Sequence, residues 1–276
     1  MASSQPAIHL VPATAHAAAK DNLPTVCAVA ALGMMLSNVL HEGLGHAATA
    51  LLTVSPSGVL STVAWNSAYD SKAVDAGGTI ANLAAAAVFW LVLRRAAGSS
   101  VTTRLFLLLA CAFNLFAGTG YFLFSGVTNF GDWAAVIDGL QPHALWRGAL
   151  IVAGVLAYRG ALIFAGTALF RHVGVFVTER RRVTRLMLTG YLAAVAIACC
   201  GGLLNPMGVK YVLLSSIPAT AGAGSGLLYM QYYARREASS GTAAGIVNRS
   251  VPWMGVSAVC ALLFIFVLGP GIHLSR

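Results

Sequence analysis

The apolar stretch at residues 24–54, PTVCAVAALGMMLSNVLHEGLGHAATALLTV, decides the fold class of this chain. It is longer than the roughly 20 residues that a helix needs to cross a bilayer. Its one acidic residue and its two histidines all fall in HEGLGH, at 41–46. Ionisable groups are expensive inside a membrane and by default mark a functional site. The stretch therefore predicts a transmembrane helix with a polar site built into it.

The composition of the whole chain agrees with a membrane protein. Of 276 residues, 58% are hydrophobic and 9% are charged, whereas a soluble domain carries about 25% charged residues. We expect an all-α, multi-pass transmembrane helical bundle of about seven spans. The sixth span contains Pro218 and a run of glycines, which predicts a broken or closely packed helix. The expected spans lie near 24–50, 78–97, 104–127, 146–170, 186–204, 210–234 and 252–270.

The basic residues predict an orientation in the membrane. If the N-terminus is cytoplasmic, twelve Lys and Arg residues fall in cytoplasmic segments and four on the other side. The positive-inside rule favours that orientation. The formal net charge of +9 is therefore interpreted as a topology signal, with the lipid bilayer as the expected partner and no nucleic acid.

The chain is expected to have three parts. Residues 1–23 predict a flexible cytoplasmic tail, 24–135 a three-helix core and 136–276 additional transmembrane helices. Between the first two spans, SGVLSTVAWNSAY (57–69) alternates with period two and is rich in β-branched residues, which predicts one or two short strands. An exposed strand edge there could pair with an extended substrate, or the segment could be an ordered loop that caps the bundle.

The histidines of HEGLGH are five residues apart, one more than in the zinc signature H-E-x-x-H. On a regular α-helix, positions five apart point about 140° away from each other. A π-type turn with i→i+5 hydrogen bonds removes most of this divergence, and such turns often occur at functional sites. Gly43 and Gly45 make a local widening of the helix cheap. We therefore expect a π-turn that lets His41 and His46 bind one metal ion.

A hydrolytic zinc site takes three protein ligands and leaves one position for water. Asp70 and Asp75 lie in the first outer loop, and Asp132 and Asp138 follow the third span. His41 is 17 residues beyond Pro24, toward the outer half of its span, and Asp132 comes just after the third span reaches the same side. His41 and Asp132 can therefore meet, and Asp132 is a candidate for the third ligand.

The order of these motifs resembles the site-2 protease family of intramembrane zinc proteases. The resemblance rests on LHEGLGHAATALL (40–52), DAGGTIANLAAAA (75–87) and FNLFAGTGYFLFSGVTNFGDW (113–133). HEGLGH also resembles the H-E-x-x-G-H zinc motif of dipeptidyl peptidase III. The chain departs from the site-2 protease pattern in its histidine spacing and in lacking the sequence N-P-x-x-x-x-D-G. The resemblance covers roughly residues 25–135.

The resemblance implies a zinc metalloprotease with Zn²⁺ on His41, His46 and Asp132, and with Glu42 as the general base. The expected substrate is a membrane protein or peptide, cut in a membrane or juxtamembrane segment. Arg159, near the middle of the fourth span, could pair with Glu42 or Asp132, or could be a helix-packing residue. Two other functions stay open: a transporter or assembly factor that uses the polar cluster for proton or metal passage, and a zinc hydrolase acting on a lipid or another non-peptide bond.

Overall fold

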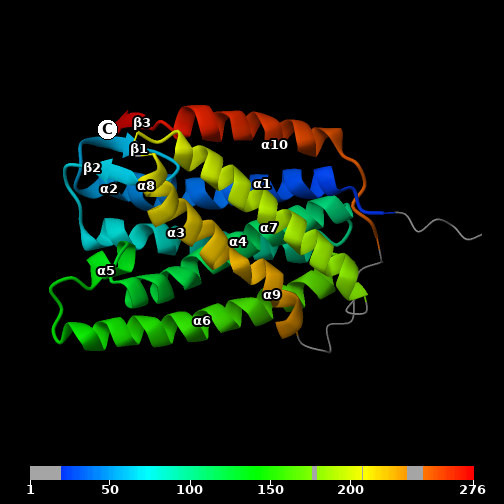
Figure 1. The fold of residues 1–276 in the computed structure, drawn as a ribbon, viewed down its shortest axis with the longest axis horizontal. Coiled ribbons are helices and arrows are strands. Elements are labelled where there is room, and N and C mark those ends of the chain that lie inside the picture. The colour runs from blue at the N-terminus through cyan, green and yellow to red at the C-terminus, as the bar shows by residue number, and fades with distance from the viewer. Residues whose placement is uncertain (1–19, 176–178, 207, 235–244) are drawn as a thin grey trace, which may run out of the picture.

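The computed structural model describes residues 20–175, 179–206, 208–234 and 245–276. The chain forms a bundle of long helices with a small sheet at one end, as Figure 1 shows. The α-helices are α1 (Leu23–Val39), α2 (Thr49–Thr53), α3 (Lys72–Arg95), α4 (Val101–Thr128), α5 (Asp132–Val136), α6 (His143–His172), α7 (Arg180–Leu203), α8 (Val209–Tyr211), α9 (Gly226–Tyr233) and α10 (Val251–Leu263). Wider π-helical turns form η1 (Leu40–Ala48), η3 (Val212–Gly222) and η5 (Phe264–Leu268), and η4 (Ala223–Ser225) is a 3₁₀ turn.

Seven helical segments in the described residues are long and apolar enough to cross a membrane, which confirms the predicted multi-pass bundle. Large apolar side chains stay exposed on the outer helices, such as Leu156 on α6 and Leu262 on α10. An apolar outer surface of this kind suits contact with lipid. The segments are Leu23–Thr53, Lys72–Arg95, Val101–Thr128, His143–His172, Arg180–Leu203, Val212–Tyr233 and Val251–Leu268.

The first two spans pack closely because glycines face each other where the helices cross. A Cβ on Gly45 would lie 2.4 Å from the Cα of Gly78, and one on Gly77 would lie 2.2 Å from the Gly45 carbonyl oxygen. Neither position could carry a side chain without moving a backbone. Small residues at such crossings let helices approach in a membrane, and here they press the HEGLGH segment against α3.

The segment between the first two spans forms two strands, as predicted, and a third strand comes from the C-terminus. Strands β1 (Ser57–Leu60), β2 (Trp65–Ser67) and β3 (Ile272–Ser275) form an antiparallel sheet in the order β2-β1-β3. Because β1 is central, both of its edges are already paired. The outer edges of the sheet belong to β2 and β3.

The sixth span changes its helical type along its length, in agreement with the broken helix expected from its sequence. It runs from α8 through the π-helix η3, which contains Pro218, and the 3₁₀ turn η4 into α9. Proline has no N–H to continue the ladder of hydrogen bonds, and its ring crowds the preceding turn. The span therefore widens beside His41 and Glu42 of the HEGLGH segment.

At the end of the bundle where α1 begins, Asp21 ties three parts of the chain together. Arg182 on α7 donates to both Asp21 carboxylate oxygens, at 2.7 and 2.8 Å, and the Val247 amide donates to Oδ1 at 2.9 Å. Burial raises the pKa of Asp21, but the hydrogen bonds from Arg182 and the Val247 amide, together with the charges of Arg182 and Arg185, hold the pKa below its usual range. Of the predicted tail, residues 1–19 lie outside the described residues.

Candidate metal centre

HEGLGH lies in the π-helix η1, so the predicted π-turn is present and extends over nine residues. The segment continues α1 without a break and leads directly into α2. His41, Glu42 and His46 are all buried, at 7%, 7% and 8% exposure. The wider turns bring the two histidines to one side of the helix although they are five residues apart.

Three possible ligand atoms, one each from His41, His46 and Asp132, lie close to one another. The distances His41 Nε2–His46 Nε2, His41 Nε2–Asp132 Oδ2 and His46 Nε2–Asp132 Oδ2 are each 3.2 Å. In a tetrahedral site with bonds of about 2.0–2.1 Å, two ligand atoms are separated by about 3.3–3.4 Å. The triangle therefore has nearly the size that such a site requires, and His41, His46 and Asp132 could hold a metal ion.

Hydrogen bonds behind the two rings fix which nitrogen carries the proton. His46 Nδ1 lies 2.7 Å from the Val74 carbonyl oxygen, which can only accept, so Nδ1–H donates. His41 Nδ1 lies 2.6 Å from Asn82 Oδ1. The Asn82 amide group donates to the Ser37 carbonyl at 3.0 Å, which leaves Oδ1 as the acceptor. Each neutral ring thus turns the lone pair of Nε2 into the site, the arrangement that orients histidine ligands in metalloproteins.

Because the Nε2 lone pairs face the site, one carboxylate oxygen of Asp132 is left without a hydrogen-bond donor. Asp132 Oδ2 is buried and accepts no hydrogen bond from the described residues, although two ring nitrogens lie 3.2 Å away. The nitrogens are close to this oxygen but not aligned to donate to it. Two bare nitrogens and a carboxylate oxygen at this separation repel one another unless a cation sits among them. This donor set fits a divalent metal ion.

Asp132 is delivered to the site by a tight reversal after the third span. Helix α4 ends at Thr128 and is capped by Asn129, which lies in the left-handed region with φ 53°, and Gly131 follows with φ 84°. The indole of Trp133 donates to Thr79 Oγ at 2.9 Å and docks α5 on α3.

Gly78 forms the floor of the site. A Cβ at this position would lie 2.5 Å from His46 Nε2 and 2.6 Å from His41 Nε2. A side chain here would fill the space onto which both nitrogens open. The absence of a side chain at Gly78 thus leaves space beside the Nε2 atoms of His41 and His46.

Glu42 lies beside the candidate ligands rather than among them. It lines a small cavity of about 30 Å³ together with His41, Asn82 and Tyr121. Such a cavity is large enough for a water molecule. The ring of Tyr121 stacks on that of His41 with centroids 5.2 Å apart and planes at 29°. The sixth span closes the cavity with polar side chains, among them Ser216 and Thr220.

The sequence prediction for Arg159 is not reproduced. The structure places Arg159 on an exposed face of α6, where it forms no ion pair with any described residue, Glu42 and Asp132 included. The buried face of α6 carries Gly154 and Ala161. Arg159 is five residues from Gly154, about 140° around an α-helix, so it turns away from the bundle and the site.

Sequence reasoning missed the second layer of the site. Asn82 and Tyr121 look like ordinary members of apolar spans, and no spacing rule marks either of them. The one signal for Asn82 is an amide in the middle of an apolar span, because a buried amide must satisfy several hydrogen bonds. Asn82 is fully buried and also donates to Asn114 Oδ1 at 2.8 Å.

Comparison of the chain with protein-family models, with curated proteins and with solved structures found no match.

Proposed function

We propose that this chain is a membrane-embedded zinc metallohydrolase, a peptidase that cleaves a membrane or juxtamembrane segment. The observation that carries the proposal is the triangle of His41 Nε2, His46 Nε2 and Asp132 Oδ2, with sides of 3.2 Å, next to buried Glu42. Two imidazoles and one carboxylate are a donor set of catalytic zinc, which keeps a fourth position for water.

The order of the parts along the chain supports the same proposal. The first span supplies two histidines and a glutamate, the second supplies the glycine floor and Asn82, and the segment after the third supplies an aspartate. This order resembles the site-2 protease family, in which the glutamate beside the first histidine is the general base. The proposal assigns that role to Glu42.

Residues around the candidate metal centre would have separate roles in hydrolysis. When bound, the zinc ion would lower the pKa of a coordinated water toward about 7 and polarise the scissile carbonyl. Glu42 would accept a proton from the attacking water and pass it to the leaving amine. Asn82 and the Val74 carbonyl hold the two histidines in the tautomer that binds metal. The stacked ring of Tyr121 limits the movement of His41.

The membrane setting supports a substrate that reaches the site from the bilayer. The site lies within a predicted span, and the cavity beside Glu42 is bordered by α4 and by the sixth span. A peptide bond in an apolar segment could be presented there without leaving the membrane.

The proposal is tested by pairing metal analysis with cleavage. The full chain is reconstituted in liposomes with a library of internally quenched apolar peptides. Glu42→Gln keeps the shape and polarity of the side chain but removes the base. We expect Glu42→Gln to bind as much metal as the wild type and to cleave at least about 100-fold more slowly, whereas Asp138→Asn, an exposed carboxylate, behaves as the wild type.

Two results would count against the proposal. The first is cleavage that survives Glu42→Gln. The second is a wild-type protein that binds metal, cleaves no peptide and carries metal ions or protons across the liposome membrane, which would identify a transporter. A bound metal other than zinc would correct the cofactor and leave the site in place.

A further inference from the structure

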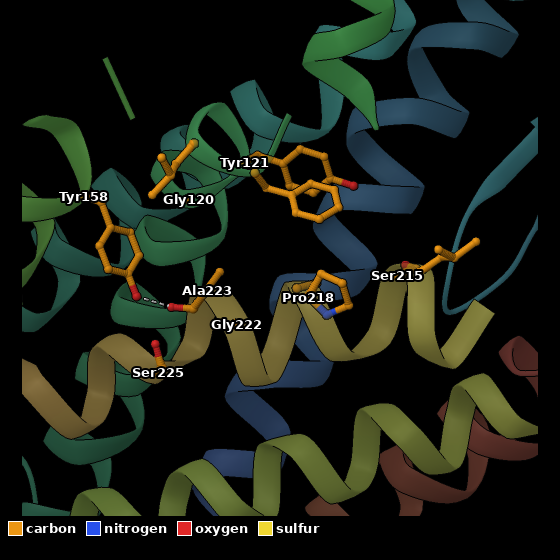
Figure 2. A pocket seen from close by; sticks show the side chains of 12 residues that line it. Gly120, Tyr121, Tyr158, Ser215, Pro218, Gly222, Ala223 and Ser225 are labelled. Carbon is orange, nitrogen blue, oxygen red and sulfur yellow. Dashed lines mark hydrogen bonds between the residues drawn. The ribbon is translucent and has the colours of Figure 1, made fainter. Parts of the chain in front are cut away.

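A second cavity, of about 320 Å³, lies between α4, α6 and the sixth span (Figure 2). Helix α4 contributes Gly120 and Tyr121, α6 contributes Tyr158, and the sixth span contributes Leu214 and Pro218. Ligand pockets range from about 300 to 1,000 Å³, so this one is at the small end. It can hold a side chain, but it is too small for a whole transmembrane helix, which is about 10 Å across.

Two of the hydroxyl groups in the walls of this cavity, those of Tyr158 and Ser215, donate to backbone carbonyls. The hydroxyl of Tyr158 donates to the Ala223 carbonyl and closes one end, as the dashed line in Figure 2 shows. At the other end, the hydroxyl of Ser215 donates to the Val63 carbonyl at 3.0 Å. An occupant therefore meets mainly carbon surface, so the fitting group is apolar.

The cavity borders the candidate metal centre. It shares Tyr121, Ser215 and Ala219 with the small cavity that Glu42 and His41 line. Tyr121 forms the partition, because its ring stacks on His41. A group seated in the larger cavity is thus separated by one aromatic ring from a candidate metal ligand.

We propose that this cavity receives an apolar side chain of the substrate, adjacent to the bond that is cleaved. The inference rests on the proposed function, because only a hydrolytic centre beside Glu42 makes the occupant a substrate. The lining residues would select an aromatic or long aliphatic side chain over a small one. Tyr121 would be the positioning residue between this side chain and the metal centre.

The test uses the full chain loaded with Co²⁺, whose visible absorption reports its ligands. Two probes are compared: acetohydroxamate, which chelates the metal, and 3-phenylpropanohydroxamate, which adds a benzyl group. Burying a side chain of this size is expected to tighten binding about 10-fold to 100-fold. Leu214→Trp and Gly120→Leu would fill the cavity without altering a residue of the smaller one. Gly160→Leu is the matched control, because nothing lies within 4 Å of its Cβ position.

The inference predicts that the benzyl preference is present in the wild type and Gly160→Leu and falls below about threefold in the two filled variants, with acetohydroxamate affinity unchanged. A Cβ at position 120 would lie 3.1 Å from the Cβ of Ala223, so Gly120→Leu could fail to fold. In that case Leu214→Trp alone tests the cavity. Acetohydroxamate binding with an equal preference in all variants would overturn the cavity assignment alone. A Co²⁺ spectrum that no hydroxamate changes would overturn the proposed function, and the cavity assignment with it.

Discussion

His41 and His46 bring their Nε2 atoms to 3.2 Å from each other although they are five residues apart in the chain. On a regular α-helix the two side chains would diverge by about 140°. The π-helix η1 removes this divergence, and Asn82 and the Val74 carbonyl then hold each ring from behind. The five-residue spacing of the histidines thus fits a π-helix. The geometry of the site also depends on α3, which supplies Asn82 and Val74.

Gly78→Ala should damage the metal centre directly. The new Cβ would lie 2.5 Å from His46 Nε2 and 2.6 Å from His41 Nε2, so at least one ring must move. We expect metal affinity to fall by about 100-fold, the upper end of the range for disturbed metal-site surroundings. Competition with a chelator of known affinity measures it. Gly160→Ala is the control, since its Cβ meets open space. Wild-type affinity in Gly78→Ala would show that the metal is bound elsewhere.

Asn82→Leu should weaken metal binding by about 10–100-fold, the usual effect of removing a partner behind a ligating histidine. His41 would lose the acceptor of its Nδ1–H, which lies 2.6 Å away. Asn82→Asp keeps an acceptor at this position and should weaken binding less. The same chelator competition measures both variants. If Asn82→Leu binds metal as tightly as Asn82→Asp, the hydrogen bond has no role in the site.

Asp21→Asn should lower the free energy of unfolding by about 2 kcal/mol at pH 7, because charge-assisted hydrogen bonds from Arg182 are lost. The folded-state pKa of Asp21 is lowered. Its contribution is therefore fully present above the unfolded-state pKa of about 3.9, and it is lost as the pH falls through the lower folded-state pKa.

Thermal unfolding in detergent at several pH values tests this prediction. The melting temperatures of the wild type and Asp21→Asn should differ at pH 7 and converge as the pH falls through the lowered folded-state pKa of Asp21. Asp138→Asn, which changes an exposed carboxylate, should follow the wild type throughout. A difference that grows toward acid pH would mean that Asp21 stabilises the fold in its protonated form.

Patterns within a single segment were enough to predict the spans and the π-turn. Apolar runs long enough for a bilayer fixed the spans, and a histidine spacing that an α-helix cannot accommodate indicated η1. The strand β3 could not be predicted, because IHLS at 272–275 is too short to show a period and forms only when α10 returns the chain to β1. Asn82 and Tyr121 join the site through packing between spans, which no local pattern records. For Arg159, the position along the fourth span could be predicted from the sequence, but the face of α6 on which it lies could not.

Metal stoichiometry of the purified full chain tests the central claim most directly. The protein is prepared without chelators and analysed by mass spectrometry of its metals, alongside His41→Ala, His46→Ala and Asp132→Asn, with Asp138→Asn as the matched control. The account predicts close to one zinc ion per chain in the wild type and in Asp138→Asn. It predicts almost none in the two histidine variants and a clear reduction in Asp132→Asn. A folded wild-type protein without a transition metal, or with a metal ion that His41→Ala and His46→Ala leave in place, would contradict it.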